Sequence, residues 1–451
     1  MTEASEHAMT SAPAPHPLES RVIGKVWRRI VPLLALALLC AYLDRVNIGF
    51  AALQMNEALG LTNTTFGFAA GLFAIGYALF AIPSALMLHR FGARRWLAFI
   101  AVVWGMCSAA TAFVSSAPEL YLARFLLGAA EAGFAPGAIL CFTLWFPSAY
   151  RGRVLASFLL ISPLGFLVGG PLSSVLLSLD GLYGFAGWQW LFVVEAAPTL
   201  LLAIALMRWL PEAPGRVGWL QDEEKAWLEG TLAAEHQAIT KARPDAGTAS
   251  GAFADLRVWL LVAVNLAAGT AGIGATMFLP LIVQSIGFST WDAGFVVTLP
   301  ALAGGASLLV WGVLSDRANN RSLVIAIACA VLASALLAAA LLLPSPWAIA
   351  ALCLAMAGYN GAVVALWTLP NTFLTGAGAA VGVAIVNIAG HLGAFTGPVL
   401  LGAIADGAHS YASGFIGLAA SAAFAIGIAL FLGALARAPA AQLTQPEAVH
   451  R

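Results

Sequence analysis

Apolar residues run along most of this chain in long stretches that short polar segments separate. A helix needs roughly 20 apolar residues to cross about 30 Å of hydrocarbon. Twelve stretches reach that length. We therefore predict an all-α membrane protein with twelve transmembrane helices, near residues 28–54, 64–88, 95–115, 118–145, 151–178, 185–210, 257–284, 291–314, 322–343, 346–372, 376–404 and 411–435.

Composition agrees with a lipid environment. The 451 residues are 61% hydrophobic and 9% charged, whereas a soluble domain carries about 25% charged residues. Partners should accordingly include the lipid bilayer but no nucleic acid. The five cysteines and the histidines show neither metal-ligand spacing nor a disulfide framework, so we expect no metal and no cofactor.

Basic residues give an orientation. Of 21 Lys and Arg residues, Arg45 and Arg124 fall inside predicted helices, and the remaining 19 (21 minus 2) lie at the termini or where even-numbered helices end. Positive residues stay on the cytoplasmic side. Both termini are therefore predicted to be cytoplasmic, in a multi-pass protein of a bacterial inner (plasma) membrane.

Polar segments divide the chain into parts. Residues 1–27 read as a disordered cytoplasmic tail, 28–210 as an N-terminal six-helix bundle and 257–437 as a C-terminal one. Between them, residues 211–256 read as a cytoplasmic linker that acts as a tether and holds one amphipathic helix, near 222–234. Residues 438–451 form a second tail.

The two halves echo each other at an offset of 227 residues. Arg90 matches Arg317 in similar loops, and the proline of "GGP", Pro171, matches Pro398 in "TGP". Parallel repeats of this kind enclose a site between the halves near the bilayer midplane. The pattern is typical of a transporter and not of an enzyme.

Four charges lie at membrane depth, where each costs at least about 2.5 kcal/mol unless it is paired or faces a wet cavity. All four are in the first half, and their counterparts 227 residues later are Ala or Gly. Two structural salt bridges between helices would explain them, but a binding site confined to one half explains the asymmetry better. The charges are Asp44, Arg45, Arg124 and Glu131.

Their chemistry suggests separate roles. Arg45 presents a permanently charged fork that matches a carboxylate, which makes it the predicted substrate anchor. Arg124 lies at a depth where it could hold Asp44 ionised. Glu131 is the deepest, among small and apolar neighbours that favour its protonated form, so it is a candidate proton carrier.

Several motifs carry a family resemblance. "GVLSDR" at 312–317 resembles the loop signature of the major facilitator superfamily, and "LDRVNIGFA" at 43–51 resembles the helix 1 signature of its anion:cation symporter family. Similar stretches lie at 124–154 and 382–398. Together the matches span about 28–435, and the pattern is most similar to the tartrate, phthalate and 4-hydroxyphenylacetate permease branch.

The resemblance implies site residues. It makes Asp44 and Glu131 the proton-coupling acids and Arg45 the anion-binding arginine. Tyr77 and Asn387 match positions that face the central cavity, while His391 stands where related permeases often have Asn and either packs or adds a titrating group. The gate loops correspond to His89, Arg90, Arg94, Asp316 and Arg317, with His89 where an acid is usual.

The resulting prediction is a proton-coupled importer (symporter) of a small organic anion, such as a hydroxy-acid or an aromatic carboxylate, working as a monomer by alternating access. Two alternatives remain open. One is a proton-antiport exporter of organic compounds, and the other is an uncoupled facilitator or nutrient sensor on the same scaffold.

Overall fold

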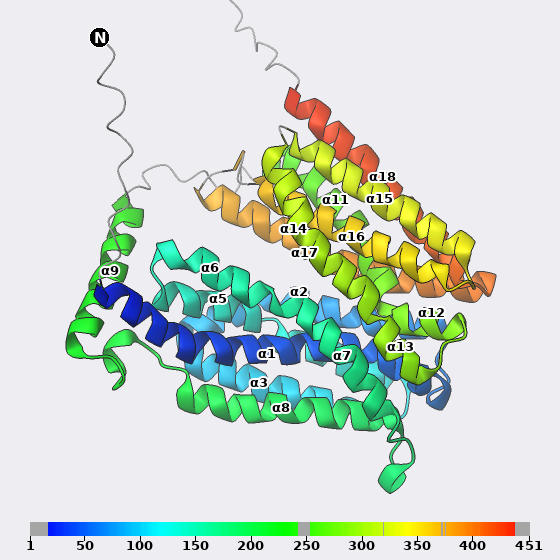
Figure 1. The fold of residues 1–451 in the computed structure, drawn as a ribbon, viewed down its shortest axis with the longest axis horizontal. Coiled ribbons are helices and arrows are strands. Elements are labelled where there is room, and N and C mark those ends of the chain that lie inside the picture. Colours follow the sequence, from blue (N-terminus) through cyan, green and yellow to red (C-terminus); the bar gives the residue numbers. More distant parts are fainter. Residues whose placement is uncertain (1–16, 242–252, 319, 371–372, 375, 438–451) are drawn as a thin grey trace, which may run out of the picture.

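A computed structural model describes residues 17–241, 253–318, 320–370, 373–374 and 376–437, and helices form nearly all of them (Figure 1). The first half of the chain forms one group of helices that pack against one another. Its members are α1 (Pro17–Ala58), α2 (Asn63–Phe91), α3 (Ala93–Thr111), α4 (Ala117–Glu131), α5 (Phe134–Trp145), α6 (Ser148–Leu159), α7 (Ile161–Leu177), the 3₁₀ turn η1 (Leu182–Gly184) and α8 (Gly187–Trp209).

The second half forms another such group, beyond η2 (Pro214–Arg216) and α9 (Asp222–Lys241). Its helices are α11 (Leu256–Met277), α12 (Leu279–Ser285), α13 (Thr290–Val296), α14 (Thr298–Arg317), α15 (Arg321–Leu342), α16 (Trp347–Thr368), α17 (Gly376–Ala408) and α18 (Tyr411–Arg437). In Figure 1 the two groups lie side by side and converge where α7 meets α13.

Within the described residues, eleven helical segments are long and apolar enough to cross a membrane. The helix α3 occupies the place of the remaining predicted span. It has 19 residues and begins with Ala93, Arg94 and Arg95, and these two charges lower its average hydropathy.

Four predicted helices are each interrupted once, and proline explains the positions. A proline has no N–H to bond the carbonyl four residues earlier, and its ring crowds that carbonyl. The helix predicted at 118–145 breaks between α4 and α5, where Pro136 leaves Ala132 without a donor. Equivalent breaks lie shortly before three other prolines. The helix ends at Leu159 before Pro163, at Met277 before Pro280 and at Val296 before Pro300.

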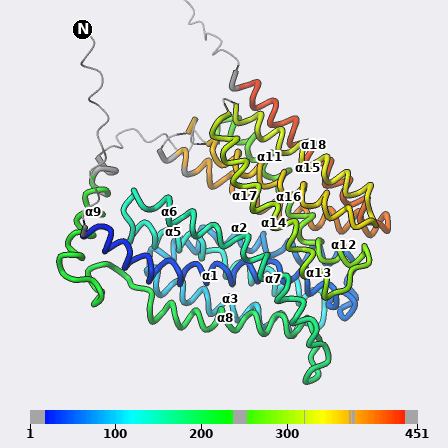
Figure 2. Tube along the Cα trace, in the orientation of Figure 1, coloured from blue at the N-terminus to red at the C-terminus, as the bar shows by residue number. Residues whose placement is uncertain are grey.

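The two groups touch at one end of the molecule. There α2 packs on α17, α7 on α13 and α1 on α12, as the trace in Figure 2 also shows. The approach of α2 to α17 depends on Gly67, because a Cβ added there would lie 2.2 Å from the carbonyl oxygen of Pro398. This end carries the loops that lack Lys and Arg.

The N-terminal boundary differs from the prediction. Residues 17–27, assigned to a disordered tail, are the first turns of α1, and they are helical because apolar Val22 and Val26 are fully buried against the bundle. Residues 1–16 of that tail lie outside the described residues, as do residues 438–451 of the C-terminal tail.

The linker helix predicted at 222–234 exists as α9 and is longer, to Lys241. It is also fixed to the first bundle, since Lys25 Nζ lies 2.7 Å from the buried carboxylate of Glu224, and Arg151 lies 3.0 Å from Glu235. Burial alone would raise the pKa of Glu224, but the hydrogen bonds from Lys25 and the Gln221 N–H bring that pKa below its usual value. The segment is therefore more than a tether.

Candidate functional site

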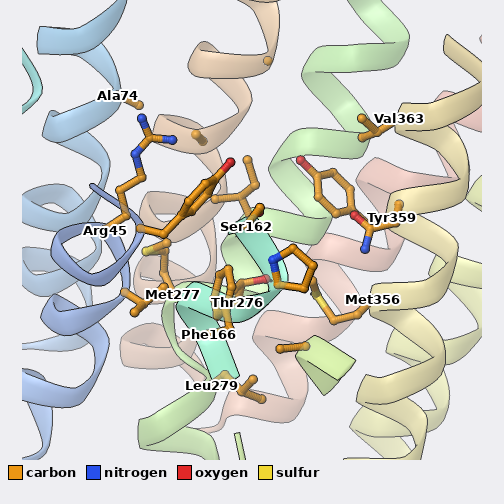
Figure 3. Close-up of a pocket in the computed structure, with 18 of the residues that line it drawn as sticks. Arg45, Ala74, Ser162, Phe166, Thr276, Met277, Leu279, Met356, Tyr359 and Val363 are labelled. Atoms are coloured by element: carbon orange, nitrogen blue, oxygen red, sulfur yellow. Dashed lines mark hydrogen bonds between the residues drawn. The ribbon is translucent and has the colours of Figure 1, made fainter. Parts of the chain in front are cut away.

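A cavity of about 390 Å³ lies between the two groups of helices, near their middle. The first group contributes cationic and aromatic side chains from α1, α2, α4 and α7. The second contributes amides, thioethers and aromatic rings from α11, α16 and α17, and apolar residues from α14. In Figure 3, Arg45 and Tyr359 enter the cavity from opposite sides. The volume suits a small ligand.

Arg45 reaches this cavity from α1, and its guanidinium is held by Glu131 from α4. Its Nε donates to Glu131 Oε1 at 2.8 Å, and its Nη2 donates to the same oxygen. The Arg45 side chain keeps 26% of its surface exposed, whereas Glu131 keeps 1%. The Oε2 of Glu131 is buried and has no hydrogen-bond partner among the described residues, so Glu131 holds the guanidinium through a single oxygen.

Arg124 also lines the cavity, yet it is only 1% exposed. Its Nη1 donates to the main-chain oxygen of Asp44 at 3.3 Å, and its Nε has no partner in the described part of the chain. The expected pairing with the Asp44 carboxylate is wrong, because that carboxylate points elsewhere. Arg124 is thus a buried cation with no carboxylate in ion-pair contact among the described residues.

Asp44 faces α3 and not the cavity. Its carboxylate accepts hydrogen bonds from Trp104 Nε1 at 2.6 Å, from Ser108 Oγ and from Asn47 Nδ2 at 3.3 Å. Asn47 also donates to Glu195 of α8 at 3.0 Å. The neighbours Asp44 and Arg45 therefore serve different surroundings, as their roughly 100° separation on a helix requires.

The three neutral candidates differ in position. Asn387 and His391 line the cavity from α17. Tyr77 stands behind them, 7% exposed, with its ring stacked on His391 at 4.6 Å between centroids. The Arg45 guanidinium lies 5.3 Å from the same tyrosine ring. Tyr77 supports the groups that face the cavity.

Several lining residues were not predicted. Asn265 and Asn360 face the cavity, and each is a polar residue inside an otherwise apolar helix, which was the available signal. Tyr359 and Trp367, aromatic residues that sequence reasoning does not distinguish from packing residues, line it as well. Ile273 of α11 adds an apolar side chain to the lining of the cavity on the side of the second group.

The end of the cavity next to the loops without Lys and Arg is closed by a cluster that we call the α2 cap. The Asp406 carboxylate of α17 accepts from the N–H and Nδ2 of Asn63 at 3.1 and 2.8 Å, and from the N–H and Oγ1 of Thr64 at 2.7 and 2.6 Å. Tyr411 donates to Asn63 Oδ1 at 2.9 Å. One half thus caps the first turn of a helix in the other half, where negative charge is favourable.

The opposite ends carry the predicted gate residues. His89 and Arg90 are exposed at the end of α2, and Asp316 and Arg317 at the end of α14. Among the described residues, no hydrogen bond or ion pair joins these four across the two halves. Arg94 instead donates from Nε to the Met207 carbonyl at 2.5 Å, within the first half.

Within the described residues, no group of three or more His, Cys, Asp or Glu side chains could hold a metal ion. The cavity instead combines a partly exposed guanidinium, a buried one and neutral polar groups on an apolar background.

Two bundles of membrane-spanning helices around a shared central cavity define a multi-pass transport protein. A sequence model of the Major Facilitator Superfamily matches residues 34–398, so the chain belongs to that superfamily. It is therefore a transport protein and not an enzyme.

Relatives narrow the comparison. A protein of Agrobacterium vitis named "Putative tartrate transporter" is 39% identical over 401 residues, which are 88% of this chain and 88% of that protein. A "Quinolone resistance transporter" of Acinetobacter baumannii is 38% identical over 405 residues, 88% of this chain and 91% of the relative. The resemblance to the tartrate permease branch is thereby confirmed.

Solved structures support the fold. A D-xylose–proton symporter matches with a TM-score of 0.71 and 16% identity, over 90% of this chain and 97% of that one. A bacterial homologue of the human lysosomal transporter Spinster, in an inward-facing and unoccupied conformation, also reaches 0.71, with 19% identity over 93% and 96% of the two chains.

Proposed function

We propose that this protein is a proton-coupled symporter that imports a small organic anion, a hydroxy-acid or an aromatic carboxylate, by alternating access. The observation that carries the proposal is the contact between Arg45 and Glu131 at the edge of the cavity. The cation that would hold a substrate carboxylate is already held by an acid that can accept a proton.

Charge balance links the proton to the anion. Among the four charges predicted for the site, ionised Asp44 and Glu131 neutralise Arg45 and Arg124. A substrate carboxylate would leave one negative charge in excess, which is unfavourable in a low-dielectric cavity. A proton on Glu131 restores neutrality and releases the Nε and Nη2 donors of Arg45 for the substrate. Anion and proton therefore bind together, and at least one proton accompanies each carboxylate.

Arg124 supplies the second attraction. Its side chain is buried, and its Nε has no partner among the described residues. A substrate carboxylate would therefore give Arg124 a negatively charged partner that the described part of the protein does not supply. Asn387 and His391 line the same cavity from α17 and would contact the part of the substrate that bears no charge. The apolar Met356 and Phe166 favour a substrate with an apolar portion.

The topology we propose has twelve spans, with residues 17–210 and 256–437 as the two bundles, 211–255 as a cytoplasmic linker and both termini cytoplasmic. The basic loops then lie inside an inner (plasma) membrane. On this orientation the α2 cap closes the outer side, and the cavity of the described conformation faces the cytoplasm. We further propose that the protein works as a monomer, since each chain holds a whole cavity.

Export by proton antiport is a second candidate, because a relative of 38% identity is named for quinolone resistance. An exporter would need its cavity to take neutral or cationic compounds. The buried Arg124 opposes a cation, since no acidic side chain pairs with it among the described residues.

Uptake by the purified full chain in liposomes separates these candidates. Radiolabelled tartrate and benzoate, as a hydroxy-acid and an aromatic carboxylate, are tested with the outside more acidic, with the outside more alkaline and with no gradient. Symport predicts that at least one of the two accumulates above its level in protein-free liposomes only when the outside is acidic. Accumulation only with an acidic lumen would support antiport, and equal rates in all three conditions would support a facilitator.

A further inference from the structure

A second cavity, of about 700 Å³, lies on the first bundle at the end that carries the basic loops. We call it the basic groove. It is bounded by residues 28–36 of α1, the start of α3, the end of α8 and the segment 210–219. Five arginines line it, from four separate parts of the chain: Arg28, Arg29, Arg94, Arg208 and Arg216.

We propose that the basic groove binds the headgroup of an anionic phospholipid. The groove shares no lining residue with the central cavity, so the proposal is independent of the transport function proposed above. Its ligand would be a phosphate diester at the membrane surface.

The charge of the groove is largely uncompensated. The one acid in its lining is Glu212, whose carboxylate lies 3.4 Å from Arg216 and 4.0 Å from Arg95. Arg28 and Arg208 are exposed, and neither takes part in an ion pair within the described residues. Five cations against one acid leave a formal charge of +4 (5 minus 1) in a single concave surface.

The remaining arginines are already oriented. Arg94 is fixed by its bond to the Met207 carbonyl. Arg29 lies with its guanidinium carbon 4.6 Å from the centroid of the Trp219 ring, which in turn stacks on Trp145. These contacts hold two guanidinium groups in place without neutralising them, and a planar guanidinium can donate two bonds to one phosphate.

The groove also has an apolar side at the depth of the lipid headgroups. The spanning helix α8 ends at Trp209, which is 67% exposed, and Leu36 of α1 is 50% exposed. Tryptophan concentrates at the membrane interface, and basic pockets between transmembrane helices on the cytoplasmic side hold anionic headgroups. A lipid could place its phosphate among the arginines and its first acyl carbons over Leu33 and Leu36.

Native mass spectrometry of the full chain in detergent tests this with two probes, dioleoyl phosphatidylglycerol and dioleoyl phosphatidylcholine. We expect at least one phosphatidylglycerol to bind the wild type more tightly than any phosphatidylcholine. Since each basic residue near a membrane surface strengthens binding to anionic lipid about fivefold, Arg28→Gln and Arg208→Gln should each weaken that binding by about this factor. Neither substitution leaves a carboxylate unpaired, so folding should persist.

The matched control is Arg153→Gln, which removes an exposed arginine of the same bundle that does not line the groove. It should change phosphatidylglycerol affinity less than twofold. The proposal would be overturned if Arg153→Gln lost as much phosphatidylglycerol affinity as Arg208→Gln. It would also be overturned if the groove substitutions weakened phosphatidylcholine binding by a similar factor. Displacement of phosphatidylglycerol by inorganic phosphate at equal concentration would likewise overturn it, in favour of a site for small soluble anions.

Discussion

Replacing Glu131 by Gln isolates the coupling step, because the amide keeps the shape of the side chain and resembles its protonated form. In the structure Glu131 occupies two N–H groups of Arg45 through one oxygen. A hydrogen bond between charged groups contributes about 1.5–3 kcal/mol. If a substrate must displace that interaction, removing the competitor should tighten anion binding by about 10- to 100-fold.

The assay is isothermal titration of purified protein with the carboxylate identified by uptake, between pH 5.5 and 8. Wild-type affinity should fall as pH rises, because a proton must accompany the anion, and Glu131→Gln should bind tightly at every pH. In liposomes the variant should exchange substrate down its own gradient without accumulating it, since no proton can leave to reset the cycle.

Glu195→Gln is the matched control, because Glu195 is also a buried acid of the first bundle but contacts Asn47 and not Arg45. Its anion affinity should follow the wild type. The reasoning is refuted if a folded Glu131→Gln protein accumulates substrate in response to a proton gradient, or if its affinity varies with pH as the wild type does. A poorly folded protein would show instead that Glu131 braces α1 against α4.

Three further predictions concern other parts of the molecule. Arg45→Lys should weaken anion binding by at least tenfold in the same titration, because an ammonium group cannot offer two parallel N–H donors; unchanged affinity would remove Arg45 as the anchor. Asp406→Asn should lose two of the four bonds that Asp406 accepts in the α2 cap and shift the ensemble toward opening at that end. This should be seen as longer distances between spin labels on α2 and α17, whereas unaltered distances would show that the cap does not hold the halves together. The pKa of Glu224 is held below its usual value in the folded protein, so the contact of α9 with the first bundle should be fully stabilised above about pH 4.3 and should weaken as pH falls through the folded-state pKa. Amide hydrogen exchange in α9, corrected for the intrinsic rate, should therefore increase at low pH in the wild type. In Lys25→Met it should already be increased at pH 7.

The membrane-spanning helices could be predicted from the sequence because the length of an apolar stretch and the position of basic residues can be read from each segment alone. The interruptions of four helices were within reach of sequence reasoning, since Pro136, Pro163, Pro280 and Pro300 each stand two to four residues after a break. They were missed because five other helices, such as α2 with Pro83, continue past a proline. Whether a helix tolerates proline depends on its neighbours, which the sequence does not show.

The site shows the same limit at the level of side chains. The depth of the two residues along their helices correctly predicted that Arg124 lies near Asp44. It did not predict that Arg124 contacts the main-chain oxygen of Asp44 and not its carboxylate. The Asp44 carboxylate turns toward Trp104 and Ser108 on α3, and those partners could not be inferred from helix periodicity in α1. Glu131 thereby meets Arg45, and Arg124 is left as the cation without an acidic partner.

The measurement closest to the central claim is the lumenal pH of liposomes that contain the protein, when substrate is added outside with equal pH on both sides and the membrane potential clamped. Symport predicts that the inward anion gradient drives protons in, so the lumen acidifies in the wild type and stays constant with Glu131→Gln. Substrate entry without any change of lumenal pH in the wild type would contradict the account.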